Sequence, residues 1–402
     1  MEKVHRAIVL GTDPGAGGTV VGGLPLAVRA VLALHAAGFD DVGLVVPGRP
    51  RWAAEPLARR GVSVQWVEPP PVEATDLPDF GDAFTLFLAG DVLLDSVAVT
   101  VLRDAPPGPV WTTAGRLVGV VCGPADALTC LRRPDLWTRS PGPGTRIAAG
   151  LAVPLGVAGS RAPLERALLE YLAGRATGDS YLAILFDRPM SRPLTRLLLR
   201  TPLAPSHVTL LGVATGLLGA GGLATMSYWG RLGGVILLLV SVVLDCVDGD
   251  MARAQLAQNP AGARLDVMGD YLVHLAVFTG LATGLWREGL PASGVWAALT
   301  LIAGVGAAMT AVHVLFIRPA LRQGGDLHWA GDTWSLRGRQ GAMVAEKLAS
   351  RDYTYLLLVL AAIGHLEWFL YAAAGGAWVF TLGLIAYRFR ALPRCRREAV
   401  SR

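Results

Sequence analysis

Residues 244–274 read LDCVDGDMARAQLAQNPAGARLDVMGDYLVH, and this stretch decides what kind of protein the chain is. Asp245 and Asp248 are three residues apart, and Asp266 and Asp270 are four apart. Each pair falls on one face of a helix, because side chains at these spacings are neighbours on a helical surface. The sequence therefore predicts two adjacent helices that each present two carboxylates.

Long apolar segments surround this stretch and predict membrane-spanning helices. The chain is 52% hydrophobic and 17% charged, with a mean hydropathy of +0.46, which is too apolar for an ordinary soluble protein. A spanning helix needs ~20 residues, so the second and third segments should continue as helices through the polar stretch between them. The six expected spans are residues 208–228, 232–247, 267–285, 295–316, 353–366 and 369–387.

Arginines mark one side of the predicted bundle. They crowd before the first span, between the second and third, between the fourth and fifth, and after the sixth. The positive-inside rule therefore predicts an integral protein of the cell's inner or plasma membrane, with both termini and the aspartates on the cytoplasmic side. Trp229, Trp286 and Trp368 fall at the predicted outer ends, where an aromatic belt is expected. The net charge of +5 is thus explained by the membrane, and no nucleic-acid partner is expected.

The acidic residues predict a metal site. Carboxylates at membrane depth are costly without a partner such as a cation. The four aspartates named above would form an oxygen-rich cage for hard divalent ions such as Mg²⁺ or Mn²⁺. Gly249, Ala252 and Gly262 leave space beside that cage, and Arg253 adds a forked donor suited to a diphosphate.

The pattern Asp245-x2-Asp248-Gly249-x2-Ala252-Arg253-x8-Gly262-x3-Asp266-x3-Asp270 resembles, at every defined position, the signature of the CDP-alcohol phosphotransferases. The resemblance extends over roughly residues 188–387, with Ser206 where the family commonly has an Asn. It implies a metal-dependent membrane enzyme that transfers a phospho-alcohol group from a CDP-alcohol to a hydroxyl acceptor and releases CMP. Phospholipid or inositol-phosphate compound synthesis and a homodimer are also implied.

The resemblance implies a role for each motif residue. Asp245, Asp248 and Asp266 would bind two metal ions, with Asp270 as a further ligand and as the general base for the acceptor hydroxyl. The residues implied to contact the CDP part of the donor are Gly249, Ala252, Arg253 and Gly262. His274, one turn beyond Asp270, is expected to be packed or interfacial rather than to tune that base. The donor could be CDP-diacylglycerol or CDP-inositol, and the acceptor an inositol phosphate, a glycerol phosphate or another polyol.

Basic side chains also gather in residues 336–352, next to the fifth expected span. They indicate either a pocket for an anionic acceptor or simple positive-inside charge, and the sequence does not decide between the two. The candidate acceptor residues are Arg337, Arg339, Lys347 and Arg351. The run from Ser350 to Asp352 resembles the family branch that makes inositol-phosphate compounds.

Before residue 180 the pattern changes to short apolar runs and helix-like stretches. Runs at residues 7–11, 42–47, 62–67 and 84–91 are expected strands, and residues 25–38 an amphipathic helix. They predict a Rossmann-like α/β domain with a largely parallel sheet. Its glycine-rich start and AGD at residues 89–91 resemble a cytidylyltransferase-type nucleotidyltransferase. No Lys occurs between Lys3 and Lys347, so the triphosphate-binding lysine of that family is missing, and a degenerate, inactive domain is expected.

The expected fold is therefore mixed. A cytoplasmic nucleotidyltransferase-like α/β domain (1–175) precedes an amphipathic juxtamembrane helix (176–204), an all-α bundle of six transmembrane helices (205–390) and a basic tail (391–402). In the juxtamembrane helix, arginines recur every four residues and are expected near lipid phosphates. These arginines are Arg188, Arg192, Arg196 and Arg200.

A cation-coupled membrane transporter is the alternative function. Intramembrane aspartates on paired helices also occur in transporters, where they bind the transported ion. The Gly-x2-Ala-Arg sequence favours the enzyme, because a cation path does not need a nucleotide-sized gap with an arginine.

Overall fold

The structure is a computed structural model of the chain. It describes residues 4, 6–11, 17–67, 84–113, 115–123, 126, 144–147, 150–155, 160–175, 181–258, 260–317 and 352–400. The chain divides into two compact units, which are described separately below. The first unit is Met1–Gly174 with Ala254–Ala257, and the second is Arg175–Arg253 with Gln258–Arg402.

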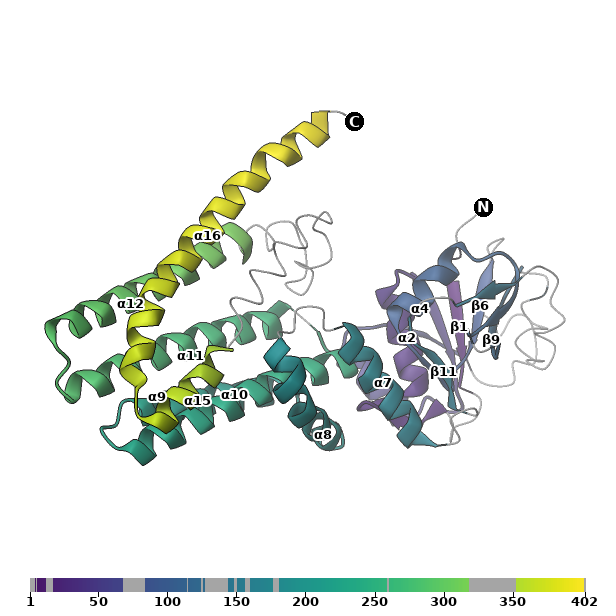
Figure 1. Ribbon diagram of the computed structural model, residues 1–402. Coiled ribbons are helices and arrows are strands. Elements are labelled where there is room, and N and C mark those ends of the chain that lie inside the picture. Colours follow the sequence, from purple (N-terminus) through teal and green to yellow (C-terminus); the bar gives the residue numbers. More distant parts are fainter. Residues whose placement is uncertain are drawn as a thin grey trace. The chain divides into compact units, whose positions relative to one another are not determined.

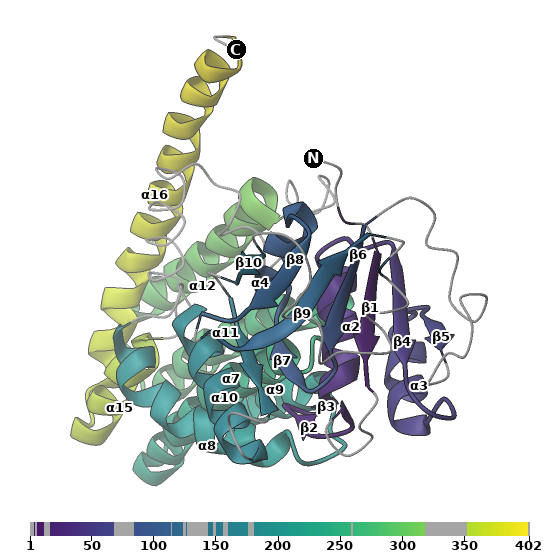
Figure 2. The same cartoon turned by 90° about the vertical axis from the view of Figure 1, so that its right-hand side faces the viewer.

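A seven-stranded mixed sheet forms the centre of the first unit (Figure 2). Its order is β10-β8-β9-β6-β1-β4-β5, and β6, β1, β4 and β5 run parallel, whereas β9 is antiparallel to both of its neighbours. The strands are β1 (Arg6–Leu10), β4 (Asp41–Val45), β5 (Gln65–Val67), β6 (Thr85–Ala89), β8 (Gly108–Trp111), β9 (Leu117–Cys122) and β10 (Thr145–Arg146). The predicted α/β domain with its largely parallel sheet is confirmed.

Short elements and helices complete the first unit. The helix expected at residues 25–38 is α2 (Leu26–Ala36), whose residues 26–34 are all buried. Arg29 lies in this buried stretch and donates to Val21 O at 3.0 Å, and burial lowers the pKa of its guanidinium to about 10. Two antiparallel pairs are β2 (Val20–Val21) with β3 (Leu24–Pro25), and β7 (Val92–Leu94) with β11 (Ala152–Pro154). The other helices are α3 (Arg51–Ala58), α4 (Ser96–Thr100), η2 (Val101–Asp104) and α7 (Arg161–Arg175).

The second unit is helical. Its described elements are a π-helical turn η4 (Ala183–Asp187), α8 (Arg188–Leu198), α9 (Pro205–Leu223), α10 (Tyr228–Ala254), α11 (Pro260–Arg287), α12 (Ala292–Val312), a π-helical turn η5 (His313–Ile317), α15 (Tyr353–Ile363) and α16 (Leu366–Val400). Figure 1 shows α9, α10, α11 and α12 running alongside one another. As predicted, the helices of the second and third expected spans extend into the polar motif: α10 ends at Ala254 and α11 begins at Pro260.

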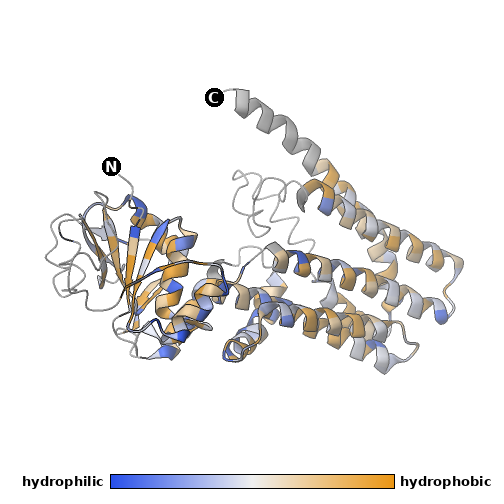
Figure 3. Ribbon diagram, turned by 180° about the vertical axis from the view of Figure 1, so that it is seen from behind, coloured by the Kyte–Doolittle hydropathy of each residue, from blue (hydrophilic) through white to orange (hydrophobic). Residues whose placement is uncertain are grey.

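Five of the described helices are long and apolar enough to cross a membrane, namely α9, α10, α11, α12 and α16. Figure 3 shows hydrophobic residues along these helices. They indicate an integral membrane protein, as the composition predicted. The fifth expected span forms α15, which has 11 residues. At 1.5 Å per residue it is about 16 Å long, compared with a hydrocarbon core of ~30 Å.

Small residues bring the motif helices close together. A Cβ atom on Gly216 of α9 would lie 2.8 Å from Val273 Cγ1 on α11 and 2.9 Å from Ser241 Oγ on α10. A Cβ atom on Gly280 of α11 would lie 2.3 Å from the carbonyl oxygen of Ala220. Neither position has room for a larger side chain, so glycine is what allows these helices to approach. The close packing of α9 against α10 and α11 builds the pocket described below.

The end of the bundle where α10 begins carries exposed tryptophans. Trp229, Trp286 and Trp368 are 75%, 65% and 63% exposed at the ends of α10, α11 and α16. At this end, Arg231 Nη1 of α10 donates to Glu288 Oε2, just after α11, at 2.8 Å. Tyr228 Oη donates at 3.0 Å to the carbonyl oxygen of Ala362, near the end of α15 and shortly before α16. The three tryptophans therefore lie at one end of the helical unit, as a membrane-interface belt requires.

Candidate active site: an acidic pocket between three helices

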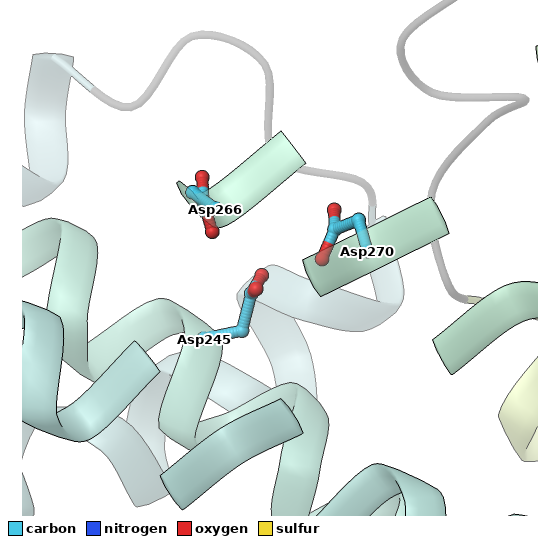
Figure 4. Close-up of side chains that lie close together, drawn as sticks. All are labelled: Asp245, Asp266 and Asp270. Atoms are coloured by element: carbon cyan, nitrogen blue, oxygen red, sulfur yellow. The ribbon is translucent and has the colours of Figure 1, made fainter. Parts of the chain in front are cut away.

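Three of the four predicted metal ligands form a close group. Carboxylate oxygens of Asp245, Asp266 and Asp270 all lie within 4.8 Å of one another, and the three side chains are half-buried. Figure 4 shows Asp245 extending from α10 toward Asp266 and Asp270 on α11. Three converging carboxylates are a donor set that hard divalent cations prefer.

The fourth aspartate, Asp248, lines the same pocket at greater depth. Its residue exposure is 5%, and its Oδ2 atom has no hydrogen-bond partner among the residues that the structure describes. A buried polar atom without a partner is unfavourable, and a cation would remove this penalty. The residues present therefore fit a divalent metal ion.

Helix α9 contributes to the pocket in a way that the sequence analysis missed. Thr209, Gly212 and Val213 line it together with Ser241 of α10 and the four aspartates. Ser241 Oγ donates to the carbonyl oxygen of Gly212 at 2.8 Å, which ties α10 to α9 beside the carboxylates. The available signal was the spacing of Thr209, Gly212 and Gly216, which lie on one helical face.

The motif residues next to the cage are arranged around Arg253. Its Nη2 donates to Asp250 Oδ1 at 2.7 Å, and its side chain is 22% exposed. A Cβ atom on Gly249 would lie 3.4 Å from both Nη1 and Nη2 of Arg253. The space at Gly249 is thus next to the Arg253 guanidinium. Ala252 and Gly262 are half-buried near the facing ends of α10 and α11.

Asp250 is a buried site residue that the sequence analysis did not identify. It is 4% exposed, and Arg188 Nη1 donates to its Oδ1 and Oδ2 at 2.8 and 2.9 Å. The expectation that Arg188 lies near lipid phosphates is therefore wrong. A buried carboxylate is stable only with a partner, and Asp250 has two, Arg188 and Arg253. The other three arginines of the series are exposed, as expected for a surface-facing side.

His274 is packed inside the bundle, as the sequence indicated. Its Nδ1 lies 2.8 Å from the backbone oxygen of Asp270, and its ring meets the ring of Tyr353 edge-on at 5.5 Å. The four candidate acceptor residues Arg337, Arg339, Lys347 and Arg351 lie outside the described residues.

A membrane helix bundle with a carboxylate pocket defines a broad class of proteins, and comparison with known families narrows it. Residues 203–384 match the model of the family described as CDP-alcohol phosphatidyltransferase. The matched region contains all four aspartates, Gly249 and Arg253. This part of the chain, slightly less than half of its length, thus resembles a CDP-alcohol phosphatidyltransferase domain.

Three curated relatives share parts of the chain. It is 45% identical over 87 residues to a bifunctional IPC transferase and DIPP synthase of Rubrobacter xylanophilus, which covers 22% of this chain and 19% of that protein. It is 40% identical over 93 residues to a phosphatidylinositol phosphate synthase of Mycolicibacterium smegmatis (23% and 40% covered). It is 34% identical over 119 residues to the synthase of the same name from Streptomyces avermitilis (29% and 46% covered). The chain thus spans less than half of the length of each relative.

Two solved structures of the phosphatidylinositol phosphate synthase of Mycobacterium tuberculosis are also similar. The apo form aligns with a TM-score of 0.32 at 24% identity, covering 48% of this chain and 94% of that one. The form with CDP-DAG bound aligns with a TM-score of 0.32 at 22% identity, covering 51% and 92%.

Proposed function

We propose that the chain is an integral membrane enzyme that transfers a phospho-alcohol group from a CDP-alcohol to a hydroxyl acceptor and releases CMP. One observation carries the proposal: the four aspartates of the motif line a single pocket within the region that resembles a CDP-alcohol phosphatidyltransferase domain. The half-buried guanidinium of Arg253 beside this pocket favours the enzyme over a cation transporter, because it suits a bound phosphate.

The chemistry follows from the charges of the pocket. Asp270 accepts the proton of the acceptor hydroxyl, whose oxygen then attacks the β-phosphorus of the donor. The bond from that phosphorus to the bridging oxygen breaks, and CMP leaves with the electron pair. Arg253 binds the diphosphate, with Gly249, Ala252 and Gly262 leaving room for the CDP part.

The metal ligands would be Asp245, Asp248, Asp266 and Asp270. We propose two ions, Mg²⁺ or Mn²⁺, which when bound would neutralise the diphosphate and stabilise the leaving group. The half-buried position of Asp245, Asp266 and Asp270 and the unpartnered Oδ2 of Asp248 support this assignment.

The names of the relatives guide the choice of substrates. Two of the three are phosphatidylinositol phosphate synthases, so CDP-diacylglycerol with an inositol phosphate is our first choice of donor and acceptor. CDP-inositol is the second donor to test, and glycerol phosphate or another polyol the next acceptor. Arg337, Arg339, Lys347 and Arg351 are proposed to bind the acceptor phosphate.

The membrane arrangement is part of the same proposal. We place α15 as a further span, the fifth of six in chain order, with both termini and the acidic pocket on the cytoplasmic side. The exposed tryptophans support this, because they gather at the end of α10 that lies 17 residues before Asp245, roughly 25 Å along the helix. Residues 176–204 would form a juxtamembrane segment on the lipid headgroups, and residues 391–402 a basic tail. A homodimer is proposed from the family resemblance.

The α/β unit is proposed to be a degenerate nucleotidyltransferase-like domain without catalytic activity. The absence of any lysine between Lys3 and Lys347 supports this, since such domains use a lysine to bind the triphosphate. Its role would be structural or regulatory.

The decisive experiment is a CMP-release assay on the purified full-length protein. CDP-diacylglycerol and CDP-inositol are each combined with inositol phosphate, glycerol phosphate and free polyols, with Mg²⁺, Mn²⁺ or EDTA. We expect CMP release for one pair, dependent on metal and lost in Asp270→Asn, but retained in Glu170→Gln, an exposed carboxylate of α7. Cation uptake into vesicles that contain the protein, with no CMP release from any donor–acceptor pair, would support the transporter instead.

A further inference from the structure

Three charged side chains form a largely buried cluster at the C-terminal end of α10, here called the charge triad (Arg188, Asp250 and Arg253). Arg188 Nη1 contacts both oxygens of Asp250 at 2.8 and 2.9 Å, and Arg253 Nη2 contacts Oδ1 at 2.7 Å. The side chains of Arg188 and Asp250 are each 6% exposed. One buried carboxylate is therefore shared by two guanidinium groups, of which that of Arg253 stays partly exposed.

The segment that supplies Arg188 is held in place by further contacts. The preceding residue, Asp187, is also buried and accepts a hydrogen bond from the hydroxyl of Tyr355 on α15. Ser191 and Thr195, on the same face of α8, are fully buried. Two consecutive residues thus attach the start of α8 to α15 and to α10. Arg188 is fixed beside Asp250 rather than free to leave it.

The charges of the triad determine what Arg253 can do. With both arginines present, the triad carries a net charge of one positive unit, because Asp250 neutralises one of the two cations. If Arg188 were missing, Asp250 would pair with Arg253 alone, and the pair would be neutral. A neutral pair attracts a phosphate much less than a cation does, and in a buried site this difference is large.

We propose that Arg188 is a positioning residue for the donor: by sharing Asp250, it leaves Arg253 with the net positive charge that binds the donor diphosphate. This inference rests on the proposed function for the nature of the ligand. It assigns to the juxtamembrane helix a part in donor binding that is distinct from contact with lipid. It also explains the buried carboxylate of Asp250, which is not among the residues that line the metal pocket.

The test is a series of variants in which the net charge of the triad changes stepwise. Binding of CDP in the presence of Mg²⁺ is measured by calorimetry on the purified full-length protein in detergent. Arg188→Ala (net zero) is expected to bind CDP roughly tenfold more weakly than the wild type, a change of about 1.4 kcal/mol. The double variant Arg188→Ala/Asp250→Asn returns the net charge to one positive unit and should recover wild-type affinity within about threefold. Asp250→Asn, with two positive units, should bind most tightly.

Controls separate this effect from loss of structure. Arg192→Ala removes an exposed arginine from the same helix and should leave CDP affinity within about twofold of the wild type. Size-exclusion profiles and melting temperatures report folding for each variant. If Arg188→Ala fails to fold, the double variant still tests the proposal, because it leaves no buried charge without a partner on Asp250. A further readout is turnover, where Arg188→Ala should raise the donor KM and leave the acceptor KM unchanged.

The outcomes are distinct. A folded Arg188→Ala protein that binds CDP as the wild type does, or a double variant that binds no better than Arg188→Ala, would overturn the inference. A folded double variant with CDP affinity far below that of the wild type would do the same. The predicted order of affinities in a protein that releases no CMP would support the inference while the proposed function fails. Absence of CDP binding by the wild type would overturn both.

Discussion

Replacing Asp266 by asparagine should stabilise the protein without metal and destroy its response to metal. In the structure the carboxylate oxygens of Asp245, Asp266 and Asp270 lie within 4.8 Å of one another. At an effective dielectric constant of about 20, two unit charges 4.8 Å apart repel each other by about 3.5 kcal/mol. Asp266→Asn removes two of the three repulsive pairs. Because solvent around these half-buried side chains screens part of this repulsion, we expect a net gain of about 2 kcal/mol, or roughly 5 °C in melting temperature.

The difference in stability between Asp266→Asn and the wild type should change sign when metal is added. Wild-type protein should gain stability with Mg²⁺ or Mn²⁺, because an ion that binds the folded state shifts the unfolding equilibrium. Asp266→Asn loses one of the converging ligands and should show little gain, and its CMP release should fall by roughly a hundredfold or more. Thermal unfolding in detergent, with EDTA and with a series of metal concentrations, measures both effects.

A matched control is Glu367→Gln, which removes a carboxylate that is partly exposed at the end of the bundle far from the aspartates. Its melting temperature with EDTA should stay within about 2 °C of the wild type, and its metal response should be unchanged. The reasoning is refuted if Asp266→Asn lowers the melting temperature in EDTA, or if it keeps the full stabilisation by metal. Either result would mean that the three carboxylates do not share an ion.

Three further predictions concern packing, membrane contact and the acceptor. Gly216→Val should lower the free energy of unfolding by about 1–3 kcal/mol through overpacking between helices. Its control is Gly221→Ala, whose Cβ would meet nothing within 4 Å and which should be neutral or stabilising by up to about 1 kcal/mol. Thermal unfolding measures both. Replacing Arg192 and Arg196 together by alanine should lower the activity on anionic vesicles several-fold, at about 1 kcal/mol per arginine, and leave the activity in neutral detergent unchanged. Arg351→Ala should raise the acceptor KM far more than the donor KM in the CMP-release assay, and equal effects would exclude an acceptor site there.

The sequence was sufficient for the elements whose pattern is local. The buried strand at residues 6–10 and the helix at residues 26–36 follow from apolar runs and periodicity. The same applies to α10 and α11, where long apolar segments extend into the motif. The length of α15 was not predictable in this way, because an apolar run of the right composition does not say where helical hydrogen bonding starts and stops.

The candidate site shows more clearly what could not be predicted from the sequence. Spacings of three and four residues placed Asp245 with Asp248 and Asp266 with Asp270, but the approach of the two pairs depends on how closely the helices pack. That distance is set by glycines such as Gly216, whose neighbours are known only in three dimensions. The four-residue period from Arg188 likewise predicted one exposed side for α8. It could not reveal a partner 62 residues away in the sequence that buries Arg188.

The charges around the pocket suggest why both a metal site and a charge triad are needed. Four aspartates line the pocket, whereas the triad beside it contributes one net positive unit, so the bare site is strongly negative when its carboxylates are ionised. A diphosphate would be repelled by such a site. Cations held by the aspartates would reverse the sign of the pocket, but they cannot supply the planar, forked donor that Arg253 offers. Since Asp250 would neutralise the charge of Arg253 if it had no second cation, the proposed role of this motif arginine requires Arg188, an arginine outside the motif.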